Sequence, residues 1–168
     1  MEHFVYLLYF FQSLLIFITP LRFLRYKSTI GQRIVFTTVY AGAVIFSREL
    51  YNFLKLPFGT HTFLLIIFST ILFKIIVKGF SWQKSIYASL FAFVVLLIND
   101  TFIVLPVLKL LGLTIGKIEV NDIFTVMFMC IMPSLLLILV YIALVIRDLV
   151  CDKKGLDDGT AFKLIDGK

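Results

Sequence analysis

Long apolar runs alternate with short basic clusters along this chain. The apolar runs fall at residues 4–24, 33–53, 60–77, 84–111 and 123–146, and few charges interrupt them. At 1.5 Å per residue, about twenty helical residues cross a hydrocarbon core of about 30 Å. The pattern therefore predicts an all-α integral membrane protein, a bundle of about five transmembrane helices in residues 1–147, followed by a short cytosolic tail in residues 148–168.

Two of the predicted helices are expected to be irregular because each contains a proline. The run at 84–111 is longer than one span requires, so we expect it to tilt or to bend near Pro106. Pro133 lies in the middle of the run at 123–146, where it removes a helical hydrogen bond and predicts a kink. The hydroxyl of Ser134 is in a position to satisfy the backbone carbonyl that the proline leaves free.

Composition and charge narrow the class of protein. Hydrophobic residues make up 61% of the 168 residues, and the mean hydropathy is +1.04. Soluble domains hold about 45–50% apolar residues, so a water-soluble core does not account for the excess. The formal net charge of +6 would suggest nucleic acid in a soluble protein. Here we expect the basic residues to face the anionic headgroups of the lipid bilayer, and nucleic acid is not an expected partner.

The basic residues also predict an orientation in the membrane. Twelve of the 16 Lys and Arg residues lie in the first and third loops and in the C-terminal segment; the other four are Arg48, Lys55, Lys109 and Lys117. Cytoplasmic loops carry an excess of Lys and Arg, so the N-terminus is predicted outside and the C-terminus in the cytosol. We expect a multi-pass protein of the cell (plasma) membrane.

Two opposite charges are predicted at the same depth. Asp100 and Arg48 lie about 24 Å and about 22 Å along their helices from the predicted cytosolic ends. Because charged side chains inside a membrane seek each other out, we expect Arg48 to pair with Asp100, with Glu49 or Asn99 as a second partner. Two alternatives stay open. Either the helix ends before Arg48, so that Arg48 and Glu49 lie among headgroups, or the ion pair is purely structural.

Other polar residues extend this candidate site. His61 begins the run at 60–77, and Gln12 lies near the middle of the run at 4–24. With the four residues above they form a candidate ligand-binding site or buried charge cluster, which we picture as a polar cup open to the outside. His61 taken alone also fits an ordinary interfacial residue.

The sequence carries no motif of a familiar enzyme class. It has no HExxH, no GxSxG and no phosphate-binding glycine loop, and its Cys and His residues are not spaced as metal ligands. Cys130 is predicted at mid-membrane depth and His61 at the outer rim, so a cysteine nucleophile activated by a histidine is not expected. We therefore predict no enzymatic activity, no cofactor and no metal site.

The run KGFSWQKSIYASLFAFVVLLINDTFIVLPVLKLLG, residues 78–112, supports a comparison with a family. It resembles the membrane sensor region of accessory-gene-regulator-type peptide-pheromone histidine kinases, in which a basic turn precedes a helix with one acidic residue inside. The resemblance spans roughly residues 63–154 and implies five to seven spans that lead into a cytosolic helix, as VIRDLVCDKKG would here. Such kinases continue into a phosphoacceptor His and an ATP-binding domain. No His follows His61, so no kinase activity resides in these residues.

The resemblance implies a non-enzymatic, membrane-embedded sensor or regulatory module. In this hypothesis the outward-facing cup binds an extracellular or membrane-borne signal, a peptide or a small molecule, and the last helix relays it to a cytosolic or membrane protein partner. Two alternatives from other classes stay open: the substrate-binding membrane subunit of a small-molecule (vitamin-type) importer, and a small channel or proton pathway. The oligomeric state, a homodimer included, stays open as well.

Overall fold

The computed structural model describes residues 2–54, 60–110 and 131–157, and all the regular structure in them is helical. The elements, in chain order, are α1 (Glu2–Phe23), α2 (Ile30–Leu54), α3 (Thr60–Ile76), α4 (Trp82–Asn99), the π-helix η1 (Asp100–Val104), α5 (Leu105–Leu110), the 3₁₀-helix η2 (Met132–Ser134) and α7 (Leu135–Asp157). Because α4, η1 and α5 follow one another without a break, they form one long helix. The predicted all-α class is confirmed for the described residues.

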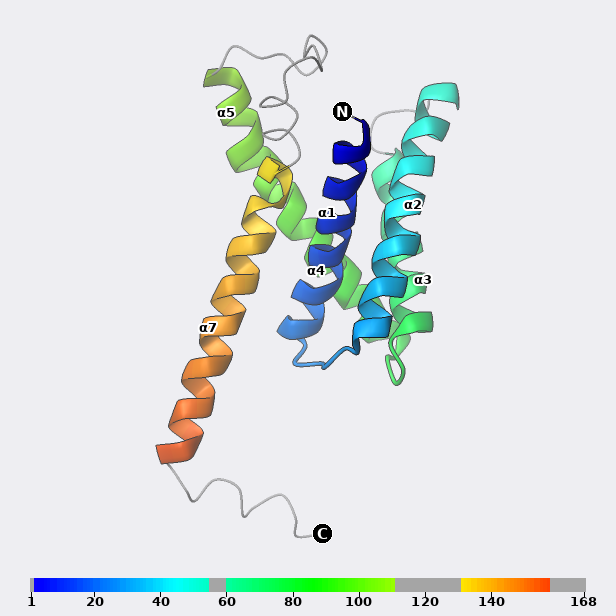
Figure 1. Ribbon diagram of the computed structural model, residues 1–168. Coiled ribbons are helices and arrows are strands. Elements are labelled where there is room, and N and C mark those ends of the chain that lie inside the picture. The colour runs from blue at the N-terminus through cyan, green and yellow to red at the C-terminus, as the bar shows by residue number, and fades with distance from the viewer. Residues whose placement is uncertain (1, 55–59, 111–130, 158–168) are drawn as a thin grey trace.

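The helices pack around α1, which lies between α2 and α7 in Figure 1. α1 contacts α2, α4 and α7, and α3 contacts α2 and α4. α7 rests on α1 and α4, and its C-terminal end projects past the loops at that end of the molecule (Figure 1). α7 is therefore attached to the rest of the bundle along one side.

Local sequence signals fix the helix ends. Thr29 and Gln32 cap α2 reciprocally, because each side chain accepts a hydrogen bond from the backbone N–H of the other, at 3.3 and 2.9 Å. Ser81 caps α4 by accepting from the backbone N–H of Lys84 at 3.3 Å. α1 ends in a turn in which Tyr26 N–H donates to the carbonyl of Leu21, with Arg25 in the left-handed conformation.

An aromatic cluster forms the centre of the bundle. The Phe36 ring stacks on Phe17 with a centroid separation of 4.5 Å and tilts against Phe73 at 4.8 Å. Tyr40 and Phe80 extend the cluster, and all five rings are buried. Because these rings come from α1, α2, α3 and the loop before α4, they hold the four segments together.

The face of α4 that packs inside the bundle is made of small residues: Ser85, Ala88, Ser89 and Ala92. Each long helix also exposes large apolar side chains on the outside of the bundle. Small residues let helix backbones approach closely, and this placement is typical of helices that pack within lipid.

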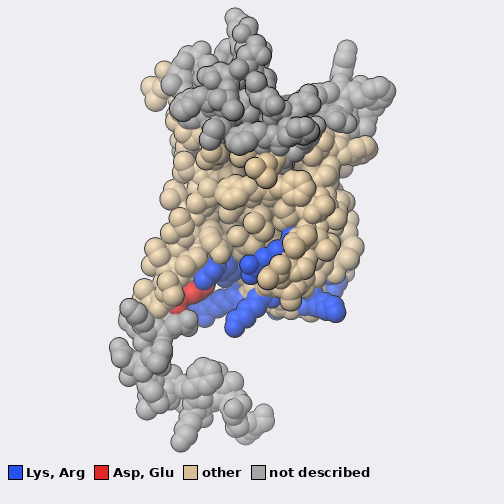
Figure 2. Space-filling model, viewed as in Figure 1, with Lys and Arg blue, Asp and Glu red and all other residues tan. Residues whose placement is uncertain are grey.

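Within the described residues, two helical segments have the length and apolar composition to cross a membrane, Ile30–Ser47 and Trp82–Leu110. Shorter apolar helices occur at Leu7–Phe23 and Thr62–Ile76. Figure 2 shows that Lys and Arg gather at one end of the molecule, below a broad surface with few charges. We call this the basic end; α1 and α3 end there, and α2 and α4 begin there.

The structure tests the expected irregularity of the fourth helix and the expected end of the second. The long fourth helix is irregular at η1, one turn before Pro106, because the proline ring would otherwise clash with the carbonyl of Phe102 in a regular α-turn. α2 continues through Arg48 and Glu49 to Leu54, so the alternative in which that helix ends before Arg48 is wrong.

α7 continues past the predicted end at residue 146 to Asp157. The physical reason is that no Pro or Gly occurs between Arg147 and Lys154 to stop the helix. The tail predicted to begin at residue 148 is therefore helical in its first part, and residues 158–168 lie outside the described ones.

Candidate functional site

Asn99 is the largest of the fully buried polar residues on the long fourth helix. Its side chain has no solvent exposure. The amide Nδ2 donates to the carbonyl of Met132 at 2.8 Å, and the amide Oδ1 accepts from the backbone N–H of Leu136 at 3.1 Å. Asn99 therefore ties the fourth helix to the beginning of α7.

The Asn99 amide takes the place of one backbone hydrogen bond that is missing at the start of α7. In a regular α-helix the N–H of Leu136 would bond to the carbonyl of Met132, four residues earlier. In η2 that carbonyl accepts from the N–H of Leu135 instead, as a 3₁₀ turn requires. The Asn99 side chain lies between Leu136 and Met132 and bonds to both, so the N–H of Leu136 does not remain unpaired in an apolar interior.

Asn99 is also adjacent to the irregular turn of its own helix. η1 begins at Asp100, where the N–H of Leu105 bonds to the carbonyl five residues back. π-turns of this kind occur often at functional sites. Two helix irregularities, η1 and η2, therefore meet at a single buried amide, and we name this contact the Asn99 junction, formed by Asn99, Met132 and Leu136.

The residues predicted to form the outward cup are placed as follows. Asp100 is exposed on the surface of η1, and Gln12 is half-buried in α1. The side chains of Arg48, Glu49 and His61 lie outside what the structure describes, so the predicted ion pair with Asp100 stays a prediction. Asn99 was expected only as a second partner for Arg48, and the structure gives it a different role.

The part predicted for Ser134 stays a prediction, because the carbonyl that Pro133 leaves free, that of Met129, lies outside the described residues. The Ser134 hydroxyl is buried and has no hydrogen-bond partner among the described residues. At the start of α7, the backbone N–H of Leu136 donates to the side chain of Asn99 on another helix.

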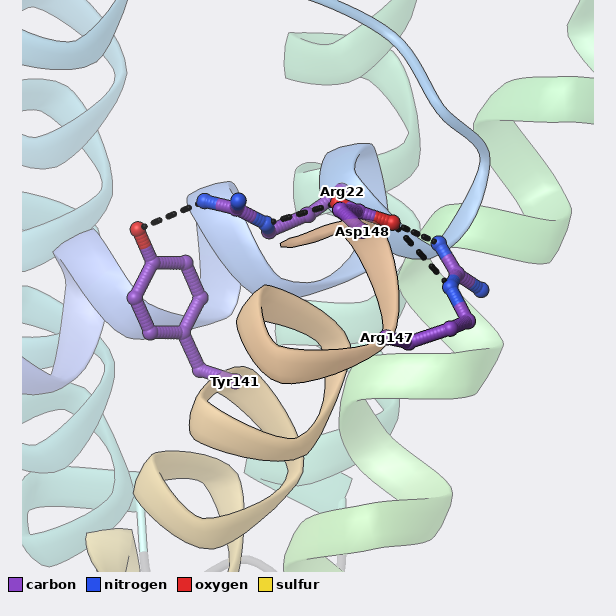
Figure 3. A network of polar contacts seen from close by, with 4 residues as sticks. All are labelled: Arg22, Tyr141, Arg147 and Asp148. Atoms are coloured by element: carbon purple, nitrogen blue, oxygen red, sulfur yellow. Dashed lines mark hydrogen bonds and ion pairs between the residues drawn. The ribbon is translucent and has the colours of Figure 1, made fainter. Parts of the chain in front are cut away.

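A second polar cluster lies at the basic end, where α7 passes α1 (Figure 3). Arg22 Nε donates to Asp148 Oδ2 at 3.0 Å, and Arg22 Nη1 donates to the Tyr141 hydroxyl at 3.3 Å. The guanidinium carbon of Arg22 also lies 5.4 Å from the centre of the Tyr141 ring. Arg147 Nη2 donates to the other oxygen, Asp148 Oδ1, at 2.8 Å. We call these four residues the Arg22 cluster.

The two arginines keep Asp148 ionised. Hydrogen bonds from Arg147 and then from Arg22 hold the pKa of Asp148 below its usual range, and they outweigh the opposite effect of partial burial. The side chains of Arg22 and Asp148 are each 32% exposed, so solvent screens the pair. The Arg22 cluster therefore supplies a weak and reversible attachment of α7 to α1.

A cavity of about 620 Å³ opens beside the Arg22 cluster. Its walls come from the end of α1, the following loop, the first turn of α2, and α7. The lining includes four basic residues, one acidic residue, a tyrosine and two apolar side chains: Arg22, Arg25, Lys27, Arg33, Asp148, Tyr141, Ile18 and Leu21. Tyr26 and Ser28 complete it. We call this cavity the basic recess.

The loop wall of the basic recess is anchored to the neighbouring loop. The Tyr26 hydroxyl donates to the carbonyl of Lys78, and its ring packs edge-on against Phe80 at 4.9 Å. The Gln32 amide donates to the carbonyl of Ile76 at 2.9 Å. Among the described residues, the side-chain hydrogen bonds between the opposite wall, α7, and α1 at this end are those of the Arg22 cluster. The basic recess thus has one fixed wall and one wall attached by contacts that can break.

These groups are suited to binding rather than to bond chemistry. The described residues contain no group of three or more His, Cys, Asp or Glu side chains placed to hold a metal ion. Guanidinium, ammonium and hydroxyl donors around a recess bind anions, and a guanidinium can bind a phosphate with two hydrogen bonds.

Sequence reasoning missed the Arg22 cluster, although the spacing in α7 carried a signal for it. Tyr141, Leu144 and Asp148 are separated by three and four residues, so they share one face of a helix. A carboxylate on that otherwise apolar face favours a cationic partner on the helix that packs against it.

Comparison of the chain with protein-family models, with curated proteins and with solved structures found no match.

Proposed function

We propose that the chain is a multi-pass membrane protein of the plasma membrane, with about five spans and its basic end in the cytosol. Three observations support this placement. Apolar side chains cover the outside of the bundle, small residues fill the α4 interface, and the basic residues gather at one end. The N-terminus, at the opposite end of α1, is then outside.

Within that membrane the chain acts as a non-enzymatic sensor or regulatory module, and α7 is the relay. The observation that carries this proposal is the Asn99 junction. It joins the π-turn of the fourth helix to the 3₁₀ turn that begins α7 through one side chain. A rotation or shift of the fourth helix at η1 therefore acts directly on the start of α7.

The relay has a second attachment at its cytosolic end, the Arg22 cluster. Leu136 and Asp148 are separated by about 18 Å along α7, and each is bonded to a different helix of the bundle. A signal shifts such a system only by binding two arrangements with different affinity. The exposed Asp100, next to the Asn99 junction and in the outer half, is the group of the proposed outward cup best placed to respond to a peptide or small molecule.

The cytosolic output of the module is the end of α7 that projects past the other helices (Figure 1). A protein partner would contact this end, and the chain itself performs no chemistry. The proposed signal, an extracellular or membrane-borne ligand, enters from the opposite side.

Hydrogen exchange of the full chain in lipid nanodiscs tests the relay. Asn99→Leu removes the bridging amide and introduces an apolar side chain of similar size. Thr101→Val is the matched control, a polar-to-apolar change at an exposed position two residues along the chain. We expect Asn99→Leu to speed amide exchange at least tenfold in the first turns of α7 and also to change exchange near Asp148. The distant change is the informative one, because a local structural role would not produce it.

An effect confined to residues next to the Asn99 junction would contradict the relay. So would an equal effect of Thr101→Val. Either result would leave α7 as an ordinary packed helix.

A further inference from the structure

The basic recess holds more positive charge than its own carboxylate balances. Four cationic side chains line it against the single carboxylate of Asp148, which is also bonded to Arg147. Arg25 and Lys27 are exposed, and neither makes an ion pair with another described residue. The potential in a recess lined by one sign of charge attracts counter-ions, and this one attracts anions.

Backbone geometry keeps one of these cations in place at a conformational cost. Arg25 has φ of 54° and is the only non-glycine residue with positive φ in the described part of the chain. Glycine usually occupies this position after a helix, because it has no side chain to clash. A charged side chain is therefore presented at a site where glycine would be less strained.

The loop wall of the recess is ordered before any ligand arrives. Tyr26 and Gln32 attach the loop wall to the α3–α4 side of the bundle. A site whose walls are already ordered loses less conformational entropy on binding. The cavity volume of about 620 Å³ lies in the range of sites that hold small organic ligands.

The lining also favours an amphiphile over a free anion. Ile18 and Leu21 form an apolar part of the wall next to the cations. Phe23 and Ile30, at the two ends of the loop that forms the recess, are exposed to the outside of the bundle. An acyl chain has apolar surface to lie on beside a polar headgroup held in the recess.

We propose that the basic recess binds the phosphate headgroup of an anionic phospholipid from the cytosolic leaflet. Arg25, Lys27 and Arg33 supply positive charge, and the Tyr141 hydroxyl supplies a neutral donor. Basic pockets between helices on the cytoplasmic side of a membrane are suited to such headgroups. The inference rests on the proposed membrane placement and not on the relay.

The same site gives the lipid a way to regulate α7. Arg22 lines the recess and is bonded to Asp148. A headgroup phosphate competes with the Asp148 carboxylate for the Arg22 guanidinium, because both are anionic acceptors of the same donors. Binding of the lipid therefore weakens the attachment of α7 at its cytosolic end.

Binding of a short-chain lipid to the full chain in neutral detergent tests the proposal. The probe is dihexanoyl phosphatidylglycerol, followed by titration calorimetry, with dihexanoyl phosphatidylcholine, glycerol phosphate and inorganic phosphate as comparisons. We expect saturable binding of the anionic lipid alone. The double variant Arg25→Gln, Lys27→Gln should weaken that binding about tenfold or more.

The matched control is the double variant Lys78→Gln, Lys84→Gln. These two lysines are exposed at the same end and do not line the recess, and their removal changes the net charge equally. We expect less than a twofold effect on affinity. If both double variants weaken binding equally, the overall positive charge attracts the lipid and the proposed site is wrong.

Two further outcomes would also overturn it. Binding of inorganic phosphate or glycerol phosphate as tightly as the lipid would make the site a receptor for soluble phosphates. Binding of the neutral lipid with equal affinity would show that the cations take no part. The calorimetric assay measures lipid affinity in detergent and does not depend on the relay. It can therefore contradict the lipid site while hydrogen exchange supports the relay, or the reverse.

Discussion

Truncation of Asn99 to alanine should destabilise the bundle by breaking its link to α7. The amide makes hydrogen bonds of 2.8 and 3.1 Å and has no solvent exposure. After Asn99→Ala the carbonyl of Met132 keeps the N–H of Leu135, whereas the N–H of Leu136 loses the partner that Asn99 gave it. The unpaired N–H is therefore the main cost.

The magnitude follows from that one orphaned donor. A buried N–H left without a partner costs about 1–3 kcal/mol, and single side-chain hydrogen bonds between membrane helices average about 0.6 kcal/mol. We expect Asn99→Ala to lower the free energy of unfolding by about 2 kcal/mol. Asn99→Asp keeps an acceptor for Leu136, and the O–H of a neutral carboxyl can still donate to Met132, so this variant should cost less than Asn99→Ala if the introduced carboxyl is neutral.

Unfolding of the full chain in mixed micelles, followed by the fluorescence of Trp82, measures this. Trp82 is the single tryptophan, so no other residue contributes to the signal. The control is Thr101→Ala, which shortens an exposed side chain and should change stability by less than about 0.5 kcal/mol. A loss below about 0.5 kcal/mol for Asn99→Ala, or a loss equal to that of the control, would refute the role given to the Asn99 junction.

The other predictions concern the charged residues. The Arg22–Asp148 attachment should persist from neutral pH down through the ordinary carboxylate range and be lost only at still lower pH, because the folded pKa of Asp148 is depressed. Hydrogen exchange of α7, measured as a function of pH, tests this. Loss of the attachment near the usual carboxylate pKa would contradict it. Arg25→Gly should stabilise the chain by about 1 kcal/mol, because glycine carries no strain at positive φ. Destabilisation in the unfolding assay would contradict that expectation. The same variant should also weaken lipid binding. The exchange of charges Arg48→Asp with Asp100→Arg should restore folding lost in either single variant if the two side chains pair, and absence of rescue in a folding assay would argue against the contact.

The helical architecture follows from the sequence because hydropathy and helix periodicity are local properties. Each apolar run produces a helix, and the capping residues Thr29 and Ser81 lie close to the predicted starts. The predicted end of α7 lies too early. The sequence changes from apolar to polar residues after Ile146, and hydropathy alone therefore ends the helix there. The backbone there has no Pro or Gly to stop it, so the polar residues continue the same helix.

The candidate site was harder to predict because it depends on which helices touch. Asn99 and Asp100 are adjacent in sequence, and depth alone assigns both to the same level. Rotation about the helix axis decides that Asn99 points into the bundle and Asp100 out of it, and the π-turn that follows alters that rotation. Arg22 and Asp148 are far apart in the chain, so only the packing of α1 against α7 brings them together.

The most direct test of the account is the position of the end of α7 relative to the rest of the bundle. Spin labels at Gln83 and Val150, both exposed, report this distance in nanodiscs when the native cysteines Cys130 and Cys151 are replaced by alanine. The account predicts one narrow distance distribution for the otherwise native chain. It predicts a second, longer component in Arg22→Gln, and no change in the charge-matched control Lys78→Gln. Identical distributions in all three proteins would contradict the claim that α7 is a relay with a releasable cytosolic attachment.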